Sequence, residues 1–184
     1  MQTDHALYCR FLAGETASYD ELMVRYGDCL TYYLHGYLHD WQDAEDLMIE
    51  AFARIMVKKP KISDGRFKAY LFKTARNLAL RFRVRKSRIQ TFGLEELHQD
   101  LTGSALMEEK FQSDERHRAL HRCMGRIDPA AREALWLVFF EDMSYSEAAT
   151  VMGVNQKKID NLLARGKRVL KQELGKEGIH HAYE

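Results

Sequence analysis

The chain has 184 residues, enough for one domain or two small ones, and its 46% hydrophobic content is that of a globular protein. Only two prolines, Pro60 and Pro129, interrupt it, which favours long helices over a sheet of many strands. No apolar run approaches the roughly 20 residues that a membrane-spanning helix needs, and the polar N-terminus does not resemble a signal peptide. We therefore expect an all-α protein that stays in the cytoplasm without inserting into a membrane.

The net charge of +1 conceals an uneven distribution along the chain. Residues 58–88 hold 12 of the 28 lysines and arginines and a single acid, whereas residues 1–57 hold 3 basic and 10 acidic side chains. A cationic cluster of this density is typical of a surface that binds a polyanion.

Apolar residues at helical spacing predict three helices in the first part of the chain. They cover residues 4–38 with a break near Gly14, residues 40–57, and residues 66–86. Pro, Ser, Asp and Gly between the last two predict a loop over residues 58–66. Helical periodicity is lost over residues 87–112, which we interpret as a flexible linker between two small helical domains.

The second domain has the pattern of a helix-turn-helix. Asp128 and Pro129 predict the start of a helix over residues 130–141, with Leu135, Trp136, Val138 and Phe139 in the core. A capping box from Ser144 to Glu147 predicts a short helix that ends at Met152. Gly153 then makes the turn, and Asn155 caps a last helix that reaches about Leu174.

The last helix carries polar and basic residues on its outer side, namely Lys157, Lys158, Asn161, Arg165 and Arg168. Lysine and arginine bind phosphates or guanine edges, and asparagine can pair with adenine. The alternative is an ordinary helical hairpin with a solvated basic face, but turn, caps and charge placement agree on a DNA-binding module.

The basic segment 58–88 interleaves aromatic rings with cations, a pattern that suits single-stranded nucleic acid. Its basic side chains could neutralise phosphates. Among the rings, Phe67 and Phe72 are expected in the core, whereas Tyr70 is expected at the surface because its hydroxyl prefers water.

Two pairs of histidines stand four residues apart, His35 with His39 and His117 with His121, the latter pair near Cys123. Such spacing can place two imidazoles on one helix face. No further ligands complete either site, so surface histidines are the better interpretation. Since no nucleophile triad, nucleotide loop or carboxylate pair stands out, we expect a protein that is not an enzyme and uses no cofactor or metal.

Two stretches of the chain resemble a known family. The run Asp43-Ala-Glu-Asp-Leu-Met-Ile-Glu-Ala-Phe-Ala-Arg54, followed by Phe67-Lys-Ala-Tyr-Leu-Phe-Lys-Thr-Ala-Arg-Asn-Leu-Ala79, resembles the first domain of bacterial RNA polymerase sigma factors. Residues 127–174 resemble their second, helix-turn-helix domain. The short linker and the absence of other domains make the chain similar to the extracytoplasmic-function (ECF) group.

The resemblance implies a division into a first domain at 1–88, a linker at 89–114, a second domain at 115–176 and a tail at 177–184. Docking on core RNA polymerase would then fall to Asp43, Asp46, Glu50 and Arg54. Capture of the melted −10 element would fall to Lys61, Tyr70, Lys73, Arg76, Asn77 and Arg81. Recognition of the duplex −35 element would fall to Asn155, Lys157, Lys158, Asn161 and Arg165. Family analogy also implies an anti-sigma factor as a partner.

Some positions depart from the family pattern. Tyr70 stands where Trp is common, and Ile49 stands where Gln is usual. Asp160 and Leu162 occupy positions that often carry basic residues, and Asp160 would repel phosphate. Gly166 replaces Ala and weakens the helix by up to about 1 kcal/mol.

Two alternatives stay open at the level of sequence. A stand-alone helix-turn-helix regulator, with an N-terminal domain that senses a ligand or dimerises, does not explain the basic segment outside the helix-turn-helix. A catalytic nucleic-acid enzyme would need a carboxylate or metal cluster beside the basic helix.

Overall fold

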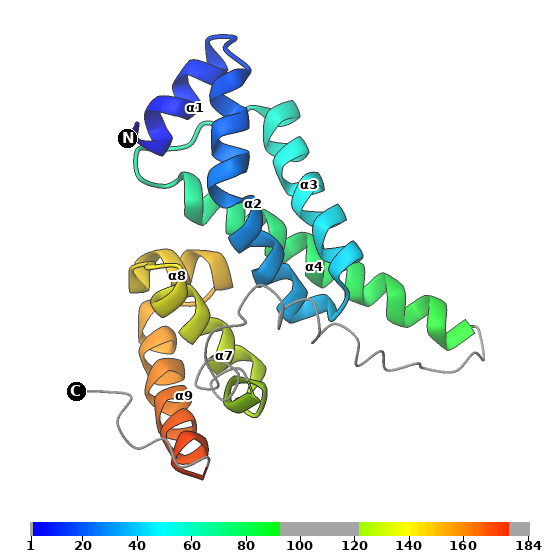
Figure 1. The fold of residues 1–184 in the computed structure, drawn as a ribbon, viewed down its shortest axis with the longest axis vertical. Coiled ribbons are helices and arrows are strands. Elements are labelled where there is room, and N and C mark those ends of the chain that lie inside the picture. Colours follow the sequence, from blue (N-terminus) through cyan, green and yellow to red (C-terminus); the bar gives the residue numbers. More distant parts are fainter. Residues whose placement is uncertain (1, 93–121, 177–184) are drawn as a thin grey trace. The chain divides into compact units, whose positions relative to one another are not determined.

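The computed structural model describes residues 2–92 and 122–176 (Figure 1). It divides into two compact units, residues 1–99 and residues 100–184. Within the described ranges every regular element is helical, which confirms the all-α prediction. None of the described helices combines the length and the apolarity that a membrane span needs.

Residues 2–92, the described part of the first unit, form four helices. They are α1 (Asp4–Leu12), α2 (Ala17–Leu38), α3 (Trp41–Lys58) and α4 (Phe67–Phe92). The break near Gly14 is confirmed, and this glycine has a φ of +106°, which residues other than glycine rarely adopt. The side chain of Asp40 caps α3 by accepting a hydrogen bond from the backbone N–H of Asp43 at 2.9 Å.

The core of this unit lies where α2 packs against α3 and α4. Leu22, Leu34, Phe52, Leu71 and Phe72 are almost completely buried there. Phe67 is buried as well, so both phenylalanines expected in the core are confirmed. Burying each large apolar side chain contributes roughly 1.5–3 kcal/mol, which holds the three helices together.

Helix α4 is longer than the sequence predicts, because it continues through the expected start of the linker to Phe92. Ser87 does not break it. Its hydroxyl instead donates a hydrogen bond to the carbonyl of Val84 at 3.0 Å, so the side chain bonds to the helix's own backbone. The remainder of the predicted linker lies outside the described residues.

The second unit contains α7 (Pro129–Leu135), the π-helical turn η1 (Trp136–Phe140), α8 (Tyr145–Met152) and α9 (Gln156–Lys176). The predicted caps are confirmed: the Asp128 carboxylate accepts from the N–H of Ala131, and Ser144 forms a complete capping box with Glu147. Gly153 makes the turn between α8 and α9 with a φ of +68°.

The prediction that Phe139 lies in the core is wrong, since half of its surface is exposed. The π-helical turn supplies the reason. The N–H of Glu141 bonds to the carbonyl of Trp136 five residues earlier, which displaces the following side chains around the axis relative to an α-helix. Leu135 and Leu137 stay buried, whereas Trp136 and Val138 are only half-buried.

Two residues of α9 that depart from the family pattern are core residues. Leu162 is 3% exposed, so a basic residue at this position would face the interior rather than DNA. Gly166 is buried against α7, where a Cβ atom would lie 2.8 Å from Leu135 Cδ1. The glycine therefore allows α7 and α9 to pack closely, a role that helix propensity alone does not reveal.

Candidate nucleic-acid interface

Helix α3 presents an acidic face that is partly engaged within the unit. The Asp43 carboxylate forms a salt bridge with Lys86 of α4 at 2.8 Å, and Glu50 pairs with Arg54 one turn away at 2.7 Å. Asp46 is exposed. All four residues expected to dock on polymerase thus lie along one helix.

Three apolar side chains of α3 are exposed as well, and the distribution of charge in the sequence does not indicate them. Ile49 is 53% exposed, Met56 is 41% exposed and Val57 is 81% exposed. Exposed apolar residues beside acids suit a protein partner better than the phosphates of DNA, which would be repelled. In the sequence, these exposed apolar residues were indicated by Ile49, which stands where the family usually has Gln.

A polar face of α4 gathers most of the residues expected at the −10 element. Tyr70, Lys73, Asn77 and Arg81 follow one another by three or four residues, so they share one side of the helix. All four are exposed, including Tyr70 at 36%, which confirms that its ring reaches solvent. Lys61, in the loop before α4, is exposed too. Arg76 is the exception: it is half-buried and lies on another side of α4.

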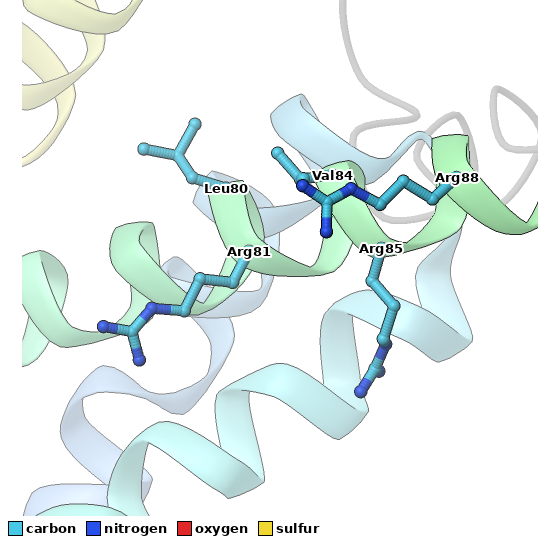
Figure 2. Close-up of a pocket in the computed structure, with 5 residues that line it drawn as sticks. All are labelled: Leu80, Arg81, Val84, Arg85 and Arg88. Atoms are coloured by element: carbon cyan, nitrogen blue, oxygen red, sulfur yellow. The ribbon is translucent and has the colours of Figure 1, made fainter.

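The same helix carries more arginine toward its end. A shallow hollow there is lined by Leu80, Arg81, Val84, Arg85 and Arg88 (Figure 2). The guanidinium of Arg85 lies 5.5 Å from the ring centre of Phe82, a distance at which the aromatic face attracts a cation. Cations therefore continue along α4 beyond the residues named from the family pattern.

The helix-turn-helix exposes the cations predicted for it. Lys157, Lys158 and Asn161 are exposed near the start of α9. Asn155 acts as the cap, because its side-chain oxygen accepts a hydrogen bond from the N–H of Lys158 at 2.8 Å. The Arg165 guanidinium lies 2.6 Å from the carboxylate of Asp128 in this structure, with about half of each side chain exposed.

The histidine pair of the first unit lies in an aromatic cluster with Trp41. The ring of His35 stacks on Trp41 with 4.0 Å between centres, and His39 lies 6.3 Å away. Among the described residues no three potential ligands come together. The pair His117 and His121 lies outside the described residues.

The fold and these surfaces define a class of protein: a helical nucleic-acid-binding protein with a basic helix in one unit and a helix-turn-helix in the other. Residues 22–89 match the family model for sigma-70 region 2, and residues 117–170 match the model for sigma-70 region 4. The chain belongs to the sigma-70 family, and within it to the ECF group. Sigma factors direct DNA-templated transcription initiation, and as a class they are not enzymes.

Similar proteins support this membership. The chain is 30% identical over 169 residues to the ECF RNA polymerase sigma factor SigE of Mycolicibacterium smegmatis, covering 90% of this chain and 65% of that protein. It is 28% identical over 156 residues to the ECF sigma factor SigM of Bacillus subtilis, covering 83% of this chain and 92% of that one. The match to region 2 leaves the stand-alone helix-turn-helix regulator disfavoured.

Solved structures show the same fold. The structure of CnrH in complex with the cytosolic domain of CnrY matches with a TM-score of 0.67 at 20% identity, covering 96% of this chain and 99% of that chain. The sigma factor RpoE in complex with the anti-sigma factor NepR from Bartonella quintana matches with a TM-score of 0.63 at 19% identity. This match covers 85% of this chain and 96% of that chain.

Proposed function

We propose that this chain binds core RNA polymerase and directs it to promoters through two DNA-binding surfaces, one in each unit. The observation that carries the proposal is the single face of α4 on which Tyr70, Lys73, Asn77 and Arg81 are all exposed, in a chain that also holds a helix-turn-helix. One surface suits an unpaired strand and the other suits a duplex. The chain would act in the cytoplasm and without catalysis of its own.

The polymerase would dock on α3. Asp43, Asp46, Glu50 and Arg54 provide charge, while Ile49 and Met56 provide exposed apolar area. This arrangement fits a protein interface, in which apolar contacts are surrounded by polar ones. An anti-sigma factor is a further proposed partner, since the solved structures of similar fold include the sigma factor RpoE in complex with the anti-sigma factor NepR.

The melted −10 element would be held by α4 and the loop before it. The Tyr70 ring can stack on an unpaired base, while Lys61, Lys73, Asn77 and Arg81 bind backbone or base edges. Arg76 is the weakest member of this set because it is half-buried. If this domain ended at residue 88, the boundary would fall inside α4, which ends at Phe92.

The duplex −35 element would be read by the start of α9. Lys157, Lys158 and Asn161, which are exposed, would enter the major groove, and Arg165 lies one turn further along. Asn155 would act mainly by capping the helix that carries these residues. Neither DNA contact needs to be strong alone, since polymerase would hold both units near one promoter and raise their local concentration.

Transcription in vitro tests the proposal. The purified chain is added to core polymerase and genomic DNA of the source organism, and the 5′ ends of the transcripts are mapped. We expect a complex with core on gel filtration and a set of discrete start sites that core alone does not produce. The absence of both a core complex and new start sites would contradict the proposal.

A further inference from the structure

Helix α1 precedes the region 2 match, which begins at residue 22, yet it contacts the loop between α3 and α4. Building on the proposed function, we infer that Tyr8 of α1 is a positioning residue that fixes this loop, residues 59–66, so that Lys61 and Tyr70 meet the unpaired strand together. Figure 1 shows the loop passing beside α1 on its way to α4.

Tyr8 touches both ends of the loop. Its hydroxyl donates a hydrogen bond to the carbonyl of Pro60 at 2.8 Å, and its ring centre lies 5.4 Å from that of Phe67, the first residue of α4. The Tyr8 side chain is only 2% exposed, and its hydrogen bond to Pro60 is partly buried. One buried residue therefore ties the entrance of the loop to its exit.

A second contact from α1 strengthens this attachment. Phe11 is one turn further along α1, and the Lys59 ammonium lies 5.2 Å from its ring centre. Lys59 ends α3 in a left-handed conformation, with a φ of +44°. The chain thus changes direction after α3, and two aromatic residues of α1, Tyr8 and Phe11, contact it there.

The loop needs such support because its own bonding is local. The N–H of Arg66 donates to the carbonyl of Ser63 at 3.1 Å, and Gly65 adopts a φ of +69°, which closes a turn just before α4. That turn does not reach the segment around Lys61. A loop that is fixed in advance loses less conformational entropy when it binds a strand.

The chemistry of Tyr8 suits a permanent donor. Burial raises the pKa of its phenol to about 12, and the nearby phenol of Tyr70 contributes to the rise. The hydroxyl therefore stays protonated at every physiological pH and can always donate to Pro60.

The test compares Tyr8→Phe with Tyr19→Phe as a matched control. Tyr19 is equally buried, and its hydroxyl donates to the carbonyl of Phe52 at 2.6 Å, within the helical core rather than in the loop. Each variant is assembled with core polymerase. The probe is a single-stranded DNA oligonucleotide that the wild-type holoenzyme enriches from a random-sequence pool.

We expect Tyr8→Phe to bind this oligonucleotide roughly fivefold more weakly, the effect of one lost hydrogen bond on an equilibrium constant. Its affinity for core should be unchanged, and amide exchange in residues 61–66 should accelerate. Tyr19→Phe should leave both DNA affinity and loop exchange as in the wild type.

Wild-type DNA affinity in Tyr8→Phe would overturn the inference, and so would an equal loss in the Tyr19→Phe control. Failure of the wild-type holoenzyme to enrich any sequence would instead overturn the proposed function itself. The two failures are therefore distinguishable.

Discussion

Replacing Gly166 by alanine should destabilise the second unit, although alanine is the better helix former. The glycine is buried in α9 where that helix crosses α7. An added Cβ would lie 2.8 Å from Leu135 Cδ1, 3.2 Å from Leu135 Cγ and 3.4 Å from Ala131 Cβ. Leu135 is 3% exposed and cannot move aside without disturbing its own neighbours.

Two effects of opposite sign determine how much Gly166→Ala changes the free energy of unfolding. Alanine gains about 1 kcal/mol of helix propensity over glycine. Forcing an extra carbon into a packed core costs typically 1–3 kcal/mol. We expect overpacking to prevail and the free energy of unfolding to fall by about 1 kcal/mol, which corresponds to a decrease in Tm of roughly 4–8 °C for a small domain.

Fluorescence can report on this unit alone. The chain has two tryptophans, of which Trp136 belongs to the second unit and stacks on Phe140 with 4.7 Å between ring centres. In a Trp41→Phe background, urea or thermal unfolding followed by fluorescence therefore monitors Trp136. Stabilisation by Gly166→Ala would refute the packing argument and leave helix propensity as the dominant effect.

A double variant sharpens the assay. Leu135→Ala removes the atoms that the new Cβ would strike, so in that background Gly166→Ala should become neutral or stabilising. The difference between the two backgrounds measures the steric contact itself. Equal effects of Gly166→Ala in both backgrounds would show that Leu135 is not the obstacle.

Three further predictions concern caps and charges. Ser144→Ala removes the capping box of α8 and should lower the stability of the second unit by about 1 kcal/mol, measured by the same fluorescence; no change would exclude the cap as a stabilising element. Two neighbouring cations hold the pKa of Glu173 below its usual range, so its carboxylate contributes stability above its unfolded pKa of about 4.3 and loses it as the pH falls through the folded value. Glu173→Gln should accordingly reduce the decline of Tm on acidification, and an identical decline would contradict this linkage. Asp43→Asn breaks the exposed bridge to Lys86 and should cost less than about 1 kcal/mol of stability, yet it should weaken core binding measured by gel filtration or fluorescence.

Local signals in the sequence predicted much of the fold because their causes are local. Asp128, Ser144 and Asn155 were predicted as caps from their neighbours along the chain, and the structure confirms each of them. The hydroxyl of Tyr70, which prefers water, likewise separated this exposed ring from buried Phe72. These features depend on the residue itself or on contacts within one or two turns, which the sequence describes.

Contacts between helices, and a local departure from α-helical geometry, were not predictable in this way. Gly166 looked like a weak point of α9, whereas its lack of a side chain allows Leu135 to approach. Phe139 has ideal core spacing for an α-helix but lies on a π-helical turn. The contact of Tyr8 with Pro60 spans 52 positions of sequence, which periodicity does not address.

The roles of the proposed site residues rest on the family pattern and on exposure together. The sequence suggested Arg76 as a DNA contact, and its half-buried position now makes it the least suited of its group. Exposed Ile49 and Met56 were not among the expected docking residues, because charge drew attention to the acids beside them.

The central claim is that the two units recognise two forms of DNA, and one binding experiment tests it directly. Holoenzymes carrying Arg165→Ala or Tyr70→Ala are titrated with two probes from one mapped promoter: the −35 duplex and the non-template −10 strand. Arg165→Ala should weaken duplex binding about tenfold and spare the single strand, since one good arginine contact contributes roughly 1–3 kcal/mol. Tyr70→Ala should show the reverse pattern. If both variants lost affinity equally for both probes, the division of recognition between α9 and α4 would be contradicted.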